Sequence, residues 1–202
     1  PHVVEAVEEL GREDPAAVDL SRVETRRNYA MVISTNAGLW RYLIGDTVMF
    51  TSLDPYRIRI TGRTRNFINA FGEELIVENA DQAIASACEQ CGAVVTDYTA
   101  APVYLQGRER GAHEWLIEFE KAPPDLARFT QCFDEALKSL NSDYEAKRSH
   151  GLMLKEPVIR ILPAGTFYRW LKSKGKLGGQ NKVPRLSNDR RYVEAILSIF
   201  EL

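Results

Sequence analysis

Runs of apolar residues in the first third of the chain predict a small β structure. Residues 29–35 form a largely apolar run, and residues 41–53 form a second β-rich segment that a Gly-Asp pair interrupts. Residues 57–62 alternate charged and apolar side chains, which is typical of a half-exposed strand. Turn-forming residues separate these segments. We therefore expect an antiparallel meander, preceded by a polar and mixed stretch over residues 1–28.

Helical spacing begins after this meander. Residues 76–92 carry apolar side chains three and four positions apart and end at a glycine. Residues 125–147 predict a long amphipathic helix, since their apolar positions share one face. These positions are Leu126, Phe129, Phe133, Ala136, Leu137 and Leu140. The other expected elements are strands at residues 93–105, 114–120 and 156–163, and helices at residues 164–175 and 189–202.

This order of elements predicts an α/β (α+β) protein. We expect a small antiparallel β meander followed by a compact two-layer α/β C-terminal domain, because strands with interspersed helices bury one face of a sheet under a helical layer. The pattern changes near residues 63–71. We accordingly place a β-rich part with a hinge at residues 1–66 and a mobile domain at residues 67–202.

Composition limits the class of protein. The chain has 202 residues, of which 45% are hydrophobic, and its 28 acidic and 26 basic residues nearly cancel. We therefore do not expect a strongly basic protein that binds along nucleic acid or a membrane surface. The sequence shows neither a bilayer-length apolar run nor a secretory leader. Three cysteines do not make a disulfide framework, which favours a cytoplasmic location.

Two of the cysteines form a CxxC pair, Cys88 and Cys91, near the end of an expected helix. Such a pair is found in redox sites and in half of a zinc site, but a structural zinc ion needs four ligands. The sequence offers no second CxxC pair and no nearby histidine pair, so we expect small buried apolar side chains and no metal site.

Three polar features are candidates for chemistry. Asp46 follows a glycine inside a β segment, where its carboxylate would accept hydrogen bonds from the hydroxyls of a ribose or complete an Asx turn. Arg63 and Arg65 lie two residues apart at the expected boundary and suit phosphate oxygens or a solvated hinge. Lys182 lies between a Gly-Gly pair and Pro184, and it is either a solvated loop residue or an ammonium group held on a flexible arm.

Taken in order, these features resemble a known family. From about Asn28 to its end, the chain is similar to the Gretchen Hagen family of acyl acid–amido synthetases, in the adenylate-forming superfamily. The resemblance rests on five features in order: a tyrosine, a Gly-Asp pair, a Gly-Arg pair, a later glycine, and a lysine. The lysine is followed, after one intervening residue, by proline and arginine. Here these are Tyr42, Gly45-Asp46, Gly62-Arg63, Gly72 and the run Lys182-Val183-Pro184-Arg185.

The resemblance implies a role for each residue. Asp46 would bind the ribose hydroxyls of ATP, Arg63 and Arg65 would contact the nucleotide, and Tyr42 would pack near it. Family members usually carry a lysine where this chain has Arg65. Lys182 would be the catalytic residue, reaching the carboxylate and the α-phosphate during adenylation. Trp40 is expected in the strand core.

The implied reaction has two steps, with ATP and Mg²⁺ required. A carboxylic acid is first adenylated, and an amino acid or amine then displaces AMP to form an amide. The phosphate-binding loop and the acyl pocket would lie in an N-terminal domain before Pro1. That domain is the expected partner, and the fragment is expected to be inactive without it.

Two alternatives stay open. One is an acyl-CoA synthetase of the same superfamily, in which the CoA thiol is the second nucleophile. The other is a non-catalytic α/β interaction module that uses its basic C-terminal stretch to bind an acidic partner. The acyl acid, the amine and the oligomeric state are not predicted by the sequence.

Overall fold

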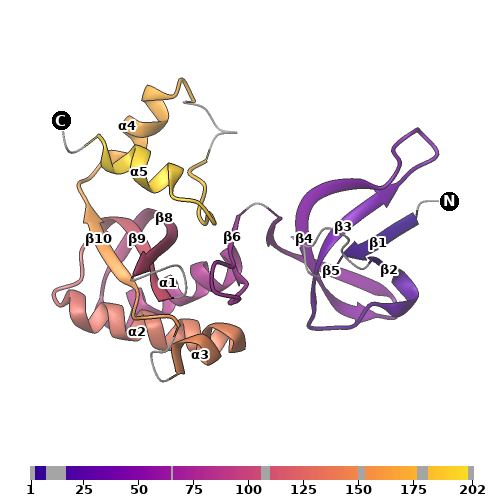
Figure 1. Ribbon diagram of the computed structural model, residues 1–202, viewed down its shortest axis with the longest axis horizontal. Helices are drawn as coiled ribbons and strands as arrows, with labels where there is room; N and C mark the ends of the chain where they lie inside the picture. Colours follow the sequence, from indigo (N-terminus) through magenta and orange to yellow (C-terminus); the bar gives the residue numbers. More distant parts are fainter. Residues whose placement is uncertain are drawn as a thin grey trace. The chain divides into compact units, whose positions relative to one another are not determined.

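The computed structural model describes residues 3–7, 17–64, 66–105, 110–149, 153–176 and 182–199. The chain divides into two compact units, Pro1–Arg65 and Asn66–Leu202. Their division lies one residue before the boundary that we placed from the sequence. Figure 1 shows the elements of each unit.

The first unit is a five-stranded antiparallel sheet with the order β2-β1-β3-β4-β5. Its strands are β1 (Val3–Val7), β2 (Ala17–Asp19), β3 (Asn28–Ser34), β4 (Tyr42–Leu53) and β5 (Tyr56–Arg63), and a short 3-10 turn, Leu20–Arg22, follows β2. The predicted meander corresponds to β3, β4 and β5. The two strands before it were not predicted, because they are short and lie in a polar stretch.

The second unit contains a three-stranded sheet with the order β10-β9-β8. Its strands are β8 (Val94–Leu105), β9 (Arg110–Lys121) and β10 (Val158–Leu162); β8 is antiparallel to β9, and β10 is parallel to it. Two shorter strands, β6 (Phe67–Ile68) and β7 (Leu75–Ile76), pair with each other. The central strand β9 is buried from Gly111 to Phe119, as expected of a strand that is covered on both faces.

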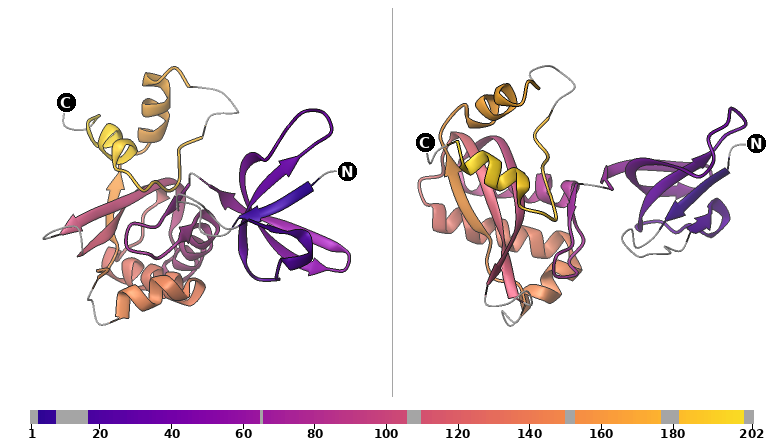
Figure 2. Two further views of the ribbon diagram at one scale, coloured as in Figure 1. Left: turned by 45° about the vertical axis from the view of Figure 1, so that its right-hand side comes forward. Right: turned by 45° about the horizontal axis from the view of Figure 1, so that its top comes forward.

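Helices cover both faces of this sheet. They are α1 (Val77–Cys91), α2 (Leu126–Leu140), α3 (Ser142–Arg148), α4 (Thr166–Ser173) and α5 (Arg191–Leu197). Figures 1 and 2 show α1 and α2 on one face and α4 and α5 on the other. The mixed α/β fold is confirmed, and α4 and α5 add a helical layer beyond the two that we predicted. Within the described residues, none of the helices has the length and apolar character that a bilayer crossing needs.

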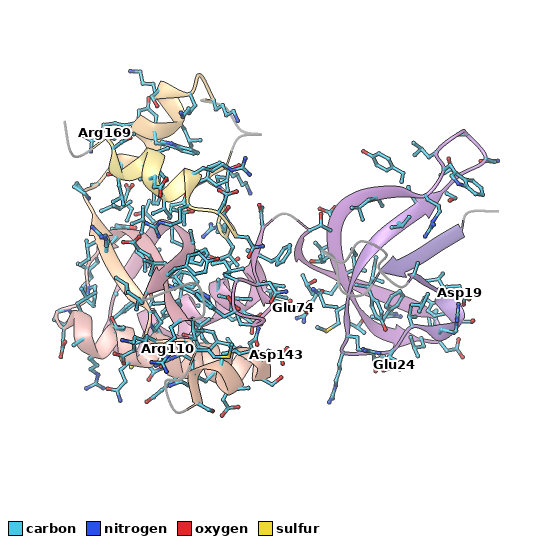
Figure 3. The ribbon with its side chains drawn as sticks, in the orientation of Figure 1. Asp19, Glu24, Glu74, Arg110, Asp143 and Arg169 are labelled. Carbon is cyan, nitrogen blue, oxygen red and sulfur yellow. The ribbon has the colours of Figure 1, made fainter. Side chains whose placement is uncertain are left out.

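The long helix predicted at residues 125–147 is two helices, with Asn141 between them. The backbone of Asn141 is extended, with φ −143°, so it ends α2 and precedes α3. Its side chain accepts a hydrogen bond from the backbone N–H of Tyr144 at 2.8 Å and donates one to the carbonyl of Glu73 at 2.9 Å. Asp143, labelled in Figure 3, lies in the first turn of α3, where a negative charge stabilises the helix.

Two buried carboxylates on β9 face the layer formed by α4 and α5. Glu114 accepts hydrogen bonds from Arg160 and, at 2.6 Å, from Arg190. Glu118 accepts hydrogen bonds from the backbone N–H groups of Gly165 at 2.6 Å and Phe167 at 3.2 Å. Both carboxylates therefore have hydrogen-bond donors inside the protein, as buried charges must.

Candidate functional site

The backbone around Gly45 places Asp46 within β4. We predicted that the Gly-Asp pair interrupts the β segment. It does not end the strand, since β4 runs from Tyr42 to Leu53, but the pairing of β4 with β3 is irregular between Leu43 and Thr47. Gly45 has φ +92°, a conformation that residues with a Cβ rarely adopt. Its carbonyl accepts hydrogen bonds from the N–H of Thr64 at 2.9 Å and from the Thr64 hydroxyl at 3.3 Å. Gly45 thus departs from regular strand geometry but stays hydrogen-bonded to Thr64, the residue that follows β5.

Asp46 lies directly opposite Arg63 in the pairing of β4 with β5. The register shifts between Thr47 and Val48, as in a β-bulge, which often redirects a side chain next to a functional site. Beside it the Thr47 and Thr61 hydroxyls lie 3.1 Å apart, and both residues are buried. Asp46 itself is partly buried.

Two aromatic residues at the start of β4 are exposed. Tyr42 is 52% exposed and Trp40 is 82% exposed. The prediction that Trp40 packs in the strand core is wrong for this unit. Both rings present apolar surface, and Tyr42 starts the strand that carries Asp46.

The two predicted arginines are described only in part. The backbone of Arg63 closes β5, and its side chain lies outside the described part of the chain. Arg65 also lies outside the described residues. Its position in the sequence is at the division between the two units.

Lys182 belongs to the second unit and is exposed, while the residue after it, Val183, is 4% exposed. Lys182 is thus exposed directly before the chain enters the packed interior at Val183. The Gly-Gly pair before Lys182 lies outside the described residues. The structure brings Asp46 and Arg63 together on paired strands, and it places Lys182 in the other unit.

A buried polar pair, which the sequence analysis missed, lies just after the division between the units. The Glu73 carboxylate is 2.7 Å from Nε2 of His113 on β9, and it also accepts the N–H of Phe71 at 2.7 Å. Burial by itself raises the pKa of Glu73, but the His113 and Phe71 hydrogen bonds outweigh it and hold the pKa below its ordinary value. The two residues are 40 positions apart in the sequence, and neither spacing nor motif signals the pair.

The cysteines are free thiols on α1 and α2, each partly buried. Burial raises the pKa of the Cys88 and Cys91 thiols, which keeps them protonated. In the part of the chain that the structure describes, no three side chains of His, Cys, Asp or Glu gather as metal ligands would.

Comparison with known families agrees with these features. A family model described as "GH3 family C-terminal domain" matches residues 78–191, and one described as "GH3 family central domain" matches residues 3–63. The chain belongs to the GH3 family. This is the Gretchen Hagen family whose motif residues the sequence resembles, so that prediction is confirmed.

The curated GH3 relatives are amido synthetases of plants. The chain is 27% identical over 191 residues to the "Probable indole-3-acetic acid-amido synthetase GH3.1" of Arabidopsis thaliana, covering 89% of this chain and 32% of that protein. It is 29% identical over 204 residues to the "Probable indole-3-acetic acid-amido synthetase GH3.2" of Oryza sativa subsp. japonica, covering 91% and 32%. The chain thus spans about a third of the length of the curated GH3 relatives that it matches.

Solved structures show the same fold. "GH3.15 acyl acid amido synthetase" matches with a TM-score of 0.69 at 18% identity, over 97% of this chain and 36% of that one. A 2-hydroxyisobutyryl-CoA ligase in the postadenylation state matches with a TM-score of 0.51 at 13% identity, over 89% and 36%. The fold of this chain is therefore shared with part of each of these two enzymes.

Proposed function

We propose that this chain is the central and C-terminal part of an ATP-dependent acyl acid–amido synthetase. One observation carries the proposal: a GH3 chain presents Asp46 on a paired strand of one unit and an exposed Lys182 on the other. These residue types suit the ribose and the phosphates of ATP, since a carboxylate accepts hydrogen bonds from hydroxyls and an ammonium group attracts phosphate.

The proposed reaction begins with adenylation. A carboxylate oxygen bonds to the α-phosphorus of ATP, and the bond to the departing pyrophosphate breaks. The nitrogen of an amino acid or amine then bonds to the acyl carbon and loses a proton to solvent, and AMP leaves with the electron pair of the broken acyl–oxygen bond of the mixed anhydride. Two anions must meet in the first step, and the Lys182 ammonium offsets their repulsion. Mg²⁺ enters with ATP, and we assign it no ligand from this chain.

The other residues would hold the nucleotide. Asp46 would accept hydrogen bonds from the ribose hydroxyls, with Tyr42 beside it. Arg63 and Arg65 would contact the nucleotide near the division between the units, where a change in backbone angles would let one unit turn against the other between the two steps.

The substrates would be a carboxylic acid and an amino acid or amine, and the partner would be a further N-terminal domain of the same protein. Neither nucleic acid nor a membrane is required. We place the protein in the cytoplasm, where three free thiols remain reduced.

The test is a product assay on the full-length protein. We expect carboxylate-dependent exchange of pyrophosphate into ATP, with indole-3-acetic acid as the first acid in a panel because the relatives' names carry it. Mass spectrometry would then show an amide with an amino acid, and the 202-residue chain alone would be the inactive control. A CoA thioester as product would favour the acyl-CoA synthetase instead. Absence of exchange with every acid would favour the non-catalytic module.

Asp46→Asn should weaken recognition of the ribose. A hydrogen bond to a charged group contributes about 1.5–3 kcal/mol, so we expect the KM for ATP to rise about 10- to 100-fold. The wild-type protein should prefer ATP over 2′-deoxy-ATP, and the variant should lose most of this preference. Asp54→Asn, at an exposed turn of the same unit, is the matched control. A variant that keeps the preference for ATP would show that Asp46 does not bind the ribose.

A further inference from the structure

The segment after Lys182 is bound along the free edge of β8. The N–H of Ala100 donates to the carbonyl of Arg185 at 2.9 Å, and the N–H of Ser187 donates to the carbonyl of Ala100 at 3.0 Å. The buried hydroxyl of Thr99 donates to the carbonyl of Pro184 at 2.6 Å. Residues 183–187 therefore extend the sheet by a short, parallel-paired piece of chain.

Apolar side chains fix this piece on both faces of the sheet. Val183 packs with the core beneath α4 and α5, and Leu186 packs with the core beneath α1 and α2. Leu186 is fully buried. Because a shift along β8 would remove each side chain from its own core, the piece is held in one register.

Arg185 binds the outer side of this piece to the rest of the unit. Its guanidinium carbon lies 4.4 Å from the ring centroid of Tyr98, which is the geometry of a cation–π contact. Its nitrogens lie 3.5 Å from Asp81 and 3.6 Å from Asp97. The Tyr98 hydroxyl donates to Asp81 at 2.7 Å, so one network joins α1, β8 and the piece that follows Lys182.

A second tie joins this piece to the start of the unit. The side-chain oxygen of Asn188 accepts a hydrogen bond from the N–H of Asn69 at 2.7 Å. Asn69 directly follows β6, three residues after the division between the units. The backbone that follows Lys182 is thus hydrogen-bonded both to β8 and to the first residues of the second unit. Lys182 would therefore move together with this unit.

We propose that Arg185 is a positioning residue, which holds the piece of chain after Lys182 against Tyr98 and so sets where the ammonium group is presented for adenylation. This inference rests on the proposed function, in which Lys182 acts in the first step. A network that fixes the base of a long side chain matters because catalysis is lost steeply when a reacting group is misplaced.

The test compares Arg185→Ala with wild type in the full-length protein. We expect pyrophosphate exchange to fall about 10-fold, with the KM for ATP changed by less than about twofold. Aminolysis of a supplied acyl-adenylate should stay at the wild-type rate, because Lys182 is not needed for it. A purely structural defect would lower both half-reactions. Arg191→Ala is the matched control, since Arg191 also lies over an aromatic ring, at 5.0 Å from the centroid of Tyr192.

A double-mutant cycle decides whether Arg185 acts through Lys182. In the Lys182→Ala background, Arg185→Ala should change exchange by less than about twofold. A further loss of about 10-fold would show that Arg185 acts independently, and it would overturn this inference while leaving the proposed function intact. If Lys182→Ala alone keeps wild-type exchange, the proposed role of Lys182 fails, and this inference fails with it. Arg185→Met, which retains packing on Tyr98, provides the same cycle if the alanine variant does not fold.

Discussion

Asp134→Asn should lower the free energy of unfolding by about 3–5 kcal/mol, since it breaks a buried ion pair from one side. Asp134 lies on α2, and its side chain is 3% exposed. It accepts hydrogen bonds from Nε and Nη2 of Arg148 at 2.7 and 2.6 Å and from the Tyr144 hydroxyl at 2.7 Å. Lys138 adds an ion pair at 2.6 Å.

The asparagine side chain has nearly the same shape but carries no charge. It would leave the Arg148 guanidinium, which is 12% exposed, without its bidentate partner. Arg148 also donates to the carbonyl of Leu154 at 3.1 Å, so its displacement would loosen the segment after α3. The loss comes mainly from the unpaired cation.

Urea denaturation followed by tryptophan fluorescence measures the effect. Trp115 and Trp170 are buried in the second unit, so their emission reports its unfolding, whereas the exposed Trp40 changes little. Glu135→Gln, an exposed neighbour on the same helix, removes the same charge and should stay within about 0.5 kcal/mol of wild type. An Asp134→Asn protein that is destabilised by less than about 1 kcal/mol would refute the prediction.

The same pair predicts a dependence on pH. Burial alone raises the pKa of Asp134, but the hydrogen bonds from Arg148, Lys138 and Tyr144 outweigh it and hold the pKa below its ordinary value. A depressed pKa in the folded state stabilises the fold above the unfolded pKa of about 3.9 and loses that contribution as the pH falls through the folded value. The difference between wild type and Asp134→Asn should therefore narrow when denaturation is repeated well below about pH 4.

Lys182→Ala should lower pyrophosphate exchange of the full-length protein by about 10²- to 10³-fold, the usual effect of removing one electrostatic stabiliser. The ammonium group acts where charge accumulates between the carboxylate and the α-phosphate, so the loss should fall on kcat more than on the KM for ATP. Aminolysis of a supplied acyl-adenylate should change little.

Lys176→Ala controls for the loss of one positive charge, because Lys176 is an exposed lysine of the same unit that precedes Lys182 in the chain. It should retain the wild-type rate. Exchange by Lys182→Ala within about threefold of wild type would remove Lys182 from the mechanism and would favour the non-catalytic module.

Sequence reasoning proposed those candidate residues of the site that a local motif marks. Asp46 and Lys182 are recognisable by their neighbours, a preceding glycine and a following Pro-Arg, and both lie in the described part of the chain with exposure to solvent. Arg185 was noted only as part of the motif, because its role depends on Tyr98, Asp81 and Asp97, which lie about 90–100 positions earlier. Such pairings leave no periodicity in a single sequence.

Local patterns in the sequence determined which elements form. The spacing of Ala80, Ala83, Ile84 and Ala87 makes α1 one-sided, and Gly92, with φ +63°, ends it. The order of these elements indicated the mixed α/β class, and short runs of specific residues indicated the family. They act between residues that are near in sequence, and so they can be read from one chain.

Only the tertiary structure decided which faces are covered and by what. The alternation of β9 is compatible with a solvated polar face, yet Glu114 and Glu118 are buried. Arg160 of β10 and Arg190, just before α5, donate to Glu114, and backbone N–H groups at the start of α4 donate to Glu118. The base of Lys182 is likewise fixed by β8, a strand far from it in sequence. The physical reason is that burial of a charge depends on partners that folding brings from distant segments, whereas the formation of a helix or strand depends mainly on neighbours.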